Sequence, residues 1–332
     1  MAIKVAFFDS KPYDETSFKN MNEHFGFDIR FHKGHLNRDN VILSKGADVV
    51  CVFVNAVVDA EVIDELINNG VKLIALRCAG FNNVDLKAAE GRIKVVRVPA
   101  YSPYAIAEHT LALMLTLNRK IHKAYSRTRD GNFSLNGLIG FDMHGKTAGI
   151  IGTGKIAKIL IQALRGLGVN VVAYDLYPDL DFAKKYDVKY TTLDELYRQS
   201  DIISLHCPLT KETEYIINDD SIAKMKDRVM IINTGRGKLI HTAALIDGLK
   251  SKKIGFAGLD VYEEESNIFY EDRSNHVIND DVLARLLSFN NVIVTSHQAF
   301  FTKEAMESIA ATTLQNIQDF VDGKPLINEV TV

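Results

Sequence analysis

The sequence predicts an α/β protein with two doubly wound parallel sheets, one on either side of a long helix. Short apolar strands alternate with amphipathic helices from residue 3 to residue 98. The same alternation resumes at Thr147 and continues to Thr295. Between the two series, Tyr104–Arg129 is helical in pattern and about long enough to connect two domains. Such alternation is typical of parallel strands, because each crossover helix covers a face of the sheet.

The first series is expected to form a flavodoxin-like domain without a dinucleotide turn of its own, since it contains no glycine fingerprint. Its predicted helices are Asp14–Phe25, Asp59–Asn69 and Asp85–Glu90. Its predicted strands are residues 3–9, Asp28–His32, Asp48–Val54, Lys72–Cys78 and Lys94–Val98.

The second series opens with a glycine turn over Thr147–Asp175, where strand, turn, helix and second strand follow one another. Gly152, Gly154 and Ala157 fit the G-x-G-x-x-G/A fingerprint of dinucleotide-binding βαβ units. Gly152 permits the tight turn, and Gly154 lets the backbone approach a pyrophosphate. Ala157 lets the helix pack closely on the strand. A bare fingerprint also occurs in ordinary turns. Here the apolar strand, the amphipathic helix and the terminal acid all stand where cofactor binding needs them.

This turn predicts NAD as the cofactor. The phosphates are expected at the positive end of the helix, near Thr153, Lys155 and Ile156. Asp175 follows the glycines by roughly 20 residues, where a carboxylate accepts hydrogen bonds from the ribose hydroxyls and repels a 2′-phosphate. NAD is therefore expected over NADP.

Six strands with the fingerprint on the first predict a Rossmann domain. After residues 147–151 they are expected at Val169–Tyr174, Ile202–His206, Val229–Asn233, Gly255–Leu259 and Val292–Thr295, with the clearest helices at Ser221–Lys226 and Thr242–Lys250. The final helix, Lys303–Val321, has no strand of its own. That helix could return to the first domain and make it discontinuous, which the sequence alone does not decide. The family resemblance described below implies this arrangement, with a substrate domain over residues 1–100 and 300–332 and an NAD-binding domain over residues 101–299.

Composition excludes several classes of protein. A formal net charge of −3 gives no reason to expect nucleic acid or an anionic membrane as partner. The N-terminus does not resemble a signal peptide, and no run of about 18 apolar residues predicts a membrane span. Cys51, Cys78 and Cys207 are far apart and predict buried thiols in a reducing, cytoplasmic compartment. His32 and His35 have a metal-like spacing but lack further ligands nearby, so we expect surface loop histidines and no metal site.

Three charged residues follow later strands of the second series, where substrate groups are expected. Arg236, in NTGRG, is suited to bidentate binding of a carboxylate. His297, in TSHQAF, is suited to proton transfer near neutral pH. Glu265, in DVYEEE, would hold the imidazole's tautomer. Each also has a plain structural interpretation, as a loop arginine, a strand-end donor or part of a solvated acidic run, and spacing alone does not choose.

Several motifs together resemble the D-2-hydroxyacid dehydrogenases over nearly the whole chain, and within that family the fermentative branch that interconverts pyruvate and D-lactate. The matching stretches are RCAGFNNVD (77–85), VPAYSPYAIAEHT (98–110), GTGKIA (152–157), LHCPLT (205–210), NTGRG (233–237), GLDVYEEE (258–265) and TSHQAF (295–300). The resemblance implies an oxidoreductase in which Arg236 binds and polarises the substrate while His297, paired with Glu265, is the acid and base.

The resemblance also assigns roles to residues that spacing does not single out. Backbone N–H groups of Ala79 and Gly80 would hold the substrate carboxylate, and Tyr101 and Phe300 would close over a small 2-keto or 2-hydroxy acid. The remaining cofactor residues it implies are Cys207, Pro208, Thr213, Thr234, Gly235 and Asp260. A homodimer or homotetramer is implied as well, through the Tyr104–Arg129 helix. Two alternatives stay open: another 2-keto acid as substrate, or an NAD(H)-sensing corepressor-like protein.

Overall fold

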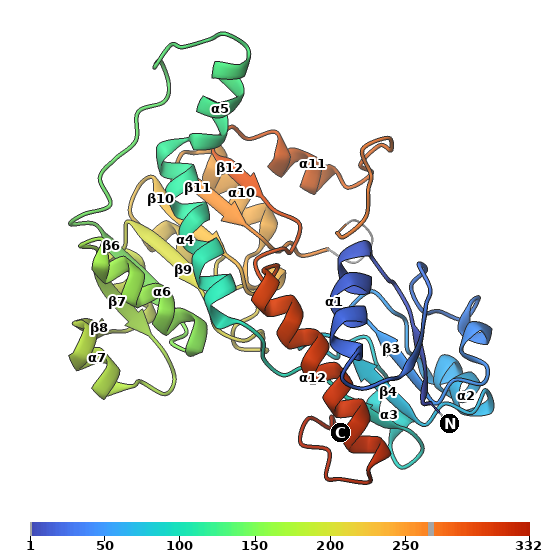
Figure 1. Ribbon diagram of the computed structural model, residues 1–332. Coiled ribbons are helices and arrows are strands. Elements are labelled where there is room, and N and C mark those ends of the chain that lie inside the picture. Colours follow the sequence, from blue (N-terminus) through green and yellow to red (C-terminus); the bar gives the residue numbers. More distant parts are fainter. Residues whose placement is uncertain (1, 265–268) are drawn as a thin grey trace. The chain divides into compact units, whose positions relative to one another are not determined.

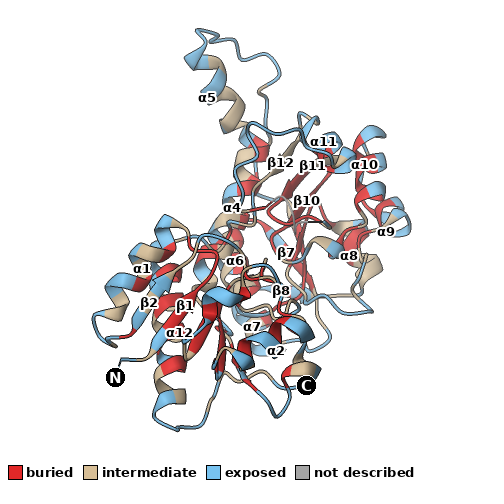
Figure 2. Ribbon diagram, turned by 90° about the vertical axis from the view of Figure 1, so that its right-hand side faces the viewer, coloured by how far each residue is buried: buried red, intermediate tan, exposed pale blue. Residues whose placement is uncertain are grey.

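The computed structural model describes residues 2–264 and 269–332, and the chain forms two compact units (Figure 1). Unit 1 consists of Met1–Ser102 together with Phe301–Val332, and unit 2 is the intervening Pro103–Phe300. Unit 2 is therefore inserted into the sequence of unit 1. Strands in both units are mostly buried, as the burial colours of Figure 2 show.

Unit 1 is a five-stranded parallel sheet in the order β2-β1-β3-β4-β5, which confirms the flavodoxin-like order expected from the sequence. The strands are β1 (Lys4–Phe7), β2 (Asp28–Phe31), β3 (Val49–Val52), β4 (Leu73–Leu76) and β5 (Lys94–Val96). The helices are α1 (Pro12–Asn22), α2 (Ala60–Asn68), α3 (Leu86–Ala89) and α12 (Lys303–Val321), with a short 3-10 helix at Val41–Ser44.

The last helix of the chain completes unit 1. Helix α12 packs against α1 and contacts β4, and Ala305, Ile309 and Leu314 on it are buried. On the other face of the sheet, Val62, Ile63 and Leu66 of α2 enter a core with apolar side chains of β1, β3 and β4. The helix that has no strand of its own thus covers a face that would otherwise expose apolar side chains to water.

Unit 2 is a seven-stranded parallel sheet in the order β12-β11-β10-β9-β6-β7-β8. Its strands are β6 (Thr147–Ile151), β7 (Asn170–Tyr174), β8 (Val188–Tyr190), β9 (Ile202–Leu205), β10 (Val229–Asn233), β11 (Ile254–Leu259) and β12 (Val292–Val294). Its helices are α4 (Pro103–Arg119), α5 (Ile121–Arg129), α6 (Lys155–Gly166), α7 (Leu180–Tyr186), α8 (Leu193–Gln199), α9 (Asp219–Lys224), α10 (Thr242–Lys250) and α11 (Asp281–Leu287), with a 3-10 turn at Gly237–Leu239.

Neighbouring residues along each strand of unit 2 enter different cores, so both faces of the sheet are covered. Ile150 and Ile232 belong to a core with α4 and α6, whereas Ile151 and Ile231 belong to a core with α8, α9, α10 and α11. The strand order reverses between β6 and β9, which makes the carboxyl edge there the expected ligand crevice of a doubly wound sheet.

Two sequence-based expectations about unit 2 are wrong. The sheet has a seventh strand, β8, whose three residues are too few to show a period in the sequence. The long helix over Tyr104–Arg129 is two helices, because Lys120 adopts a left-handed conformation with φ of 52°. The chain after α5 returns to this break, where the Asn118 side chain bonds the amide and carbonyl of Phe141 at 2.8 and 2.7 Å.

Helix α5 and the segment after it extend from the rest of unit 2 (Figures 1 and 2). No residue of α5 is buried. Among the residues that the structure describes, no helix is long and apolar enough to cross a membrane.

Candidate active site

The turn between β6 and α6 has the shape that a dinucleotide requires. Gly152 has φ of 88°, in the left-handed region that side chains rarely adopt. A Cβ atom there would lie 2.5 Å from the backbone nitrogen of Cys207, at the end of the neighbouring strand β9. Only glycine therefore fits, and Ala157, fully buried, lets α6 lie close to the sheet. The sequence predicted the glycine; the contact with Cys207 is its structural cause.

The N-terminus of α6 is open to a ligand. Gly154 is the N-cap residue and has no side chain with which to cap the helix. The amides of Lys155 and Ile156 in the first turn then carry the positive end of the helix dipole, which favours phosphate. Cys207, Pro208 and Thr213 come from the neighbouring strand β9 and its following loop, where the Thr213 hydroxyl donates to the Pro208 carbonyl at 2.6 Å.

Asp175, at the end of β7, is held in place as an acceptor. Its carboxylate accepts hydrogen bonds from the Thr153 amide at 2.6 Å, the Thr153 hydroxyl at 2.8 Å and the Tyr177 amide at 2.8 Å. Partial burial alone would raise its pKa, but the bonds from Tyr177 and Thr153 lower it, so the group is an anion. The hydroxyl of Tyr190 on β8 donates to the Thr153 hydroxyl at 2.9 Å and completes the network.

These observations fit NAD. The glycine turn excludes side chains from the phosphate position, the helix end supplies uncapped amides, and an ionised acid stands where the ribose hydroxyls are recognised. Sequence reasoning missed Tyr190, because β8 itself was missed. His206 and Cys207 beside the turn are half-buried, and desolvation raises the pKa of Cys207 to about 11.

Arg236 lies at the carboxyl edge of β10, in a turn with Thr234 and Gly235. It is exposed, its guanidinium donates to the Gly235 carbonyl at 2.8 Å, and it makes no ion pair within the described ranges. Gly237 is needed for a reason that the sequence did not reveal: a Cβ atom there would lie 1.8 Å from the Tyr262 carbonyl oxygen. The guanidinium is thus presented on a rigid turn without a carboxylate of its own, as anion binding requires.

His297 lies beyond the carboxyl end of β12, on a turn built around Asp260. Its amide donates to the Asp260 carbonyl at 2.8 Å, and its φ of 48° is in the left-handed region. The Asp260 carboxylate, fully buried, accepts from the Gln298 amide at 2.9 Å and the Ala299 amide at 2.8 Å. The Tyr270 hydroxyl donates to the His297 carbonyl at 3.2 Å. The imidazole therefore stands on a fixed, strained turn, as functional residues often do.

Two residues that sequence reasoning gave no role support this turn. The Thr295 hydroxyl donates to the Asp260 carboxylate at 2.5 Å, and the His109 ring nitrogen Nε2 lies 3.1 Å from the Thr295 hydroxyl. Burial lowers the pKa of His109, although the charge of Asp260 opposes this. Thr234, beside Arg236, shares a 2.8 Å hydrogen bond with Thr110, which lies next to His109 on α4. Their sequence signals were the motif over residues 98–110, which contains His109 and Thr110, and the motif over residues 295–300, which begins with Thr295.

Asp260 was expected to bind the cofactor; in the structure it also holds neighbouring turns together. Its carboxylate bonds the turn that carries His297, and its amide donates to the Asn233 carbonyl at 2.9 Å, just before Arg236's turn. Asp260 therefore ties together the ends of β10, β11 and β12. The structure brings the turns of Arg236 and His297 to one edge of the sheet, whereas Glu265 lies outside the described residues.

In unit 1, Ala79 and Gly80 follow β4. Their carbonyl oxygens accept hydrogen bonds from Arg97 at 2.8 Å and from the Cys78 thiol at 3.3 Å. Their amide N–H groups have no hydrogen-bond partner in the part of the chain that the structure describes. Two successive unpaired amides are suited to an anion. Tyr101, in unit 1, and Phe300, at the end of unit 2, are each half-buried.

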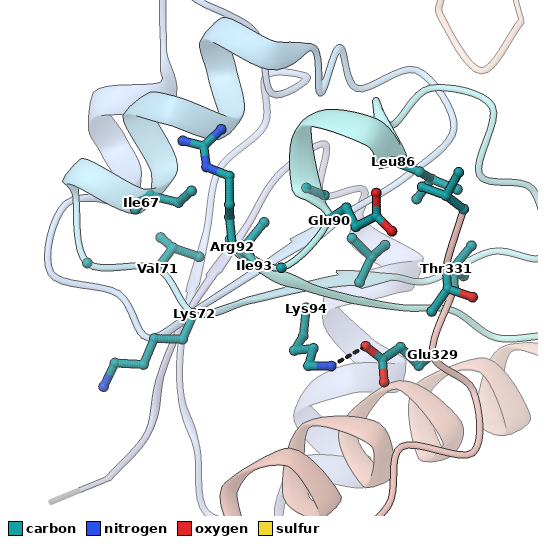
Figure 3. A pocket seen from close by; sticks show the side chains of 16 residues that line it. Ile67, Val71, Lys72, Leu86, Glu90, Arg92, Ile93, Lys94, Glu329 and Thr331 are labelled. Carbon is teal, nitrogen blue, oxygen red and sulfur yellow. Dashed lines mark hydrogen bonds and ion pairs between the residues drawn. The ribbon is translucent and has the colours of Figure 1, made fainter.

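A cavity of about 620 Å³ lies elsewhere in unit 1, and none of the predicted site residues lines it (Figure 3). Two of its three lysine and arginine side chains have acidic partners: Arg92 is 2.6 Å from Asp64 and Lys94 is 2.6 Å from Glu329. We assign it no role in the site.

Fold and site together define an NAD-dependent dehydrogenase, with the cofactor turn, an arginine and a histidine on the carboxyl edge of one doubly wound sheet. Residues 111–299 match the family model described as D-isomer specific 2-hydroxyacid dehydrogenase, NAD binding domain. The chain belongs to this family, and NAD is its cofactor.

Whole-length relatives agree with this assignment. The chain is 52% identical to a 2-hydroxyacid dehydrogenase homolog of Haemophilus influenzae, with 99% of each chain covered. It is 50% identical to the D-lactate dehydrogenase of Escherichia coli, with 99% of this chain and 100% of the relative covered. The apo structure of D-lactate dehydrogenase from Escherichia coli superimposes with a TM-score of 0.92 at 48% identity, covering 99% of this chain and 100% of that one.

Proposed function

We propose that this protein is an NAD-dependent D-lactate dehydrogenase that reversibly converts pyruvate and NADH into D-lactate. The observation that carries the proposal is the 50% identity over the full length to a protein of that name. The site supports it independently, because an unpaired arginine and a fixed histidine stand at the same sheet edge as the cofactor turn.

Arg236 binds the substrate carboxylate and polarises the adjacent carbonyl. An arginine forms two parallel hydrogen bonds with a carboxylate, and its charge stabilises negative charge that develops on the carbonyl oxygen. The backbone of Arg236 is held for this, since the Asn233 side chain donates to the Arg236 carbonyl at 2.9 Å. Ala79 and Gly80 are proposed to donate their backbone N–H groups to the same carboxylate.

His297 donates a proton to the carbonyl oxygen in the direction of reduction and removes it in the direction of oxidation. When bound, NADH supplies the hydride for the carbonyl carbon. The Asp260 turn fixes the histidine backbone, and Glu265 is proposed to orient the imidazole. Tyr101 and Phe300 are proposed to exclude larger 2-keto acids.

The test is NADH oxidation with pyruvate, followed by NAD reduction with D- and L-lactate separately. We expect turnover with pyruvate and with the D isomer only, and slower turnover with glyoxylate, hydroxypyruvate and branched 2-keto acids. Preference for one of those acids would assign a different substrate. Tight NADH binding without turnover of any 2-keto acid would contradict the proposal and favour an NAD(H)-sensing role.

His297→Ala tests the proton-transfer role. We expect kcat to fall by at least about 10²-fold, because a positioned acid and base typically contributes 10²–10⁴-fold. NADH affinity should stay within about twofold, since the cofactor turn is formed by other residues. His276→Ala, an exposed histidine of the same unit, is the control. Normal turnover by the His297 variant would remove the assignment.

We further propose a homo-oligomer in a reducing, cytoplasmic compartment. Beyond α4, exposed apolar side chains gather on α5 and the following segment; Phe133, Leu135 and Ile139 are 76, 82 and 85% exposed. Such a surface favours burial against another copy. Cys51, Cys78 and Cys207 are thiols and not disulfides, as a reducing compartment favours. Light scattering should show a dimer or tetramer that Leu135→Glu weakens; a monomeric parent would contradict this.

A further inference from the structure

We propose that Arg97 is a positioning residue for substrate binding, acting through the peptide group between Ala79 and Gly80. This inference rests on the proposed function, because it takes that peptide as a ligand of the substrate carboxylate. Arg97 itself directly follows β5, within the same unit. Neither the motifs nor the family resemblance gave it a role.

The loop after β4 has an asymmetric pattern of hydrogen bonds. Every carbonyl from Cys78 to Phe81 accepts one: Cys78 from the Val98 amide at 3.2 Å, Ala79 from Arg97, Gly80 from the Cys78 thiol, and Phe81 from the Val84 amide at 3.1 Å. The amides of Ala79, Gly80 and Phe81 donate to nothing among the described residues. The loop therefore holds its acceptors toward the protein and leaves its donors available for an anion.

Arg97 controls one of these donors directly. Its Nη1 donates to the Ala79 carbonyl oxygen at 2.8 Å. That carbonyl and the Gly80 N–H belong to one peptide group, which is trans, so the two bonds point in opposite directions. Fixing the oxygen on the guanidinium therefore aims the N–H away from Arg97. A charged donor on the oxygen also polarises the peptide, which makes its N–H a stronger donor.

Arg97 is held rigidly enough to act in this way. Its guanidinium carbon lies 5.1 Å from the ring centre of Phe81, on the same loop. Its amide donates to the Asn328 carbonyl at 3.1 Å, and its carbonyl accepts from the Asn316 side chain at 2.9 Å. Asn316 is buried on α12. The C-terminal segment that supplies these contacts is fixed on β5 nearby, where Figure 3 shows the ion pair of Lys94 and Glu329.

The charge of Arg97 is not neutralised by a neighbour. Within the described ranges no carboxylate forms an ion pair with it, whereas Arg77 and Arg92 of the same unit both have acidic partners. An arginine whose role was only to join two loops would need no free charge. A full positive charge on the peptide that binds a carboxylate favours the anionic substrate over neutral ligands.

The test measures three affinities for Arg97→Met and Arg97→Lys. In the enzyme with NADH bound, we expect the Kd of oxamate, a carboxylate analogue of pyruvate, to rise at least about tenfold for the methionine variant, as loss of one charge-assisted hydrogen bond implies. Lysine keeps the charge without the planar fork and should lose about threefold. The KM of pyruvate should rise in parallel, with kcat changed less and the Kd of NADH unchanged.

Arg92→Met is the matched control. Arg92 also donates to a backbone carbonyl, that of Ala88 at 3.2 Å, but it does not touch the loop after β4. Its loss should leave oxamate affinity unchanged. If Arg97→Met does not fold, Arg97→Lys alone carries the test. An unchanged oxamate Kd, or equal losses in oxamate and NADH affinity, would overturn the proposal. A parent enzyme that does not reduce pyruvate would instead overturn the proposed function.

Discussion

The first βα turns of the two units occupy equivalent places in their sheets but are built for opposite purposes. In unit 2 the turn after β6 is Gly152–Gly154, with a left-handed glycine and an uncapped helix end. In unit 1 the turn after β1 is Asp9–Lys11, and the left-handed position is occupied by Asp9, with φ of 56° and an exposure of 1%. One turn excludes side chains, and the other is filled by them.

The unit 1 turn is closed by a cluster of charges. The Asp9 carboxylate lies 3.2 Å from Lys11 and 3.1 Å from His35, and Arg77 lies 3.5 Å from Asp14. Arg77 also donates to the carbonyls of Phe8 at 3.1 Å and Asp9 at 2.6 Å. Burial alone would raise the pKa of Asp9, but the bond from His35 and the charge of Arg77 lower it.

The two turns therefore differ in whether side chains occupy the space at the helix end. Both helices, α1 and α6, begin at the carboxyl edge of a parallel sheet and point their N-termini outward. In unit 1 the Asp14 carboxylate accepts from the Lys11 amide at 3.2 Å and satisfies the helix end. In unit 2 the N-cap residue is Gly154, which has no side chain to cap the helix, and we propose that the cofactor phosphates occupy that position. His35, expected to be a surface loop residue, is part of the closed turn.

The largest effect is expected from Arg77→Met. Removing the guanidinium leaves Asp14 buried without its cationic partner and takes away one of the cations around Asp9. Breaking a buried ion pair in this way typically costs about 3–5 kcal/mol. Urea unfolding should show this loss in unit 1, while NADH affinity measured below the transition stays unchanged. Arg92→Met, which breaks an exposed ion pair with Asp64, should cost less than about 1 kcal/mol. Equal losses in the two variants would contradict a structural role for the unit 1 turn.

Gly152→Ala should weaken NADH binding by at least about 100-fold, which corresponds to about 2.7 kcal/mol. The new Cβ atom meets backbone of Cys207 at 2.5 Å in a conformation that alanine rarely adopts. Fluorescence titration with NADH measures the change. Gly166→Ala, at the other end of α6 with open space around its Cβ position, is the control and should bind normally. Near-normal binding by the Gly152 variant would show that the turn has another function.

His206 should make unit 2 lose stability below neutral pH. Burial lowers the pKa of His206 to about 4 from its ordinary 6.5, so between these values the unfolded chain binds more protons than the folded one. Stability is therefore lost as pH falls through this window, by at most about 3 kcal/mol. We expect the unfolding free energy to depend less steeply on pH in His206→Gln than in the parent, measured from about pH 4.5 to about pH 7. His276→Gln should keep the parental slope; equal slopes in all three would refute the prediction.

The smallest effect expected is on cofactor selectivity. Asp175→Asn removes the negative charge that would repel a 2′-phosphate, so the preference for NADH over NADPH should fall by about tenfold. Parallel kcat/KM measurements with the two cofactors test it. Asp179→Asn, four residues away and paired with Lys158, should leave the ratio unchanged. If the ratio is unchanged in Asp175→Asn, Asp175 does not recognise the ribose.

The fold was predictable because two periodic signals are strong over long stretches. Alternating strands and helices predicted both sheets, and the fingerprint identified β6. Local conformation was not predictable: beside the break at Lys120, Asn118 bonds Phe141, a residue of the returning chain, and the sequence pattern does not contain this contact. Likewise β8, with three residues, is a strand because β7 lies beside it, not because of its own pattern.

Within the site, residue types were predictable and their supports were not. Arg236 and His297 were singled out by their chemistry and because each comes directly after a predicted strand. Asp260, buried and bonded to the His297 turn, and Arg97, bonded to the Ala79 carbonyl, act through contacts between distant segments. A sequence pattern does not contain such contacts. The need for glycine at position 237, where a Cβ atom would meet the Tyr262 carbonyl, also depends on such a contact.

The insertion of unit 2 within unit 1 has a consequence for how the chain is synthesised. Residues Met1–Ser102 leave the ribosome first, but α12, which covers part of their sheet, begins only at Lys303. At 5–20 residues per second, the N-terminal segment waits roughly 10–40 s for its missing helix. All of unit 2 is available during that interval, whereas unit 1 lacks the helix that covers part of its sheet until translation is nearly complete. A premature stop near the end of the message would therefore remove the N-terminal unit's fold and leave the cofactor unit intact.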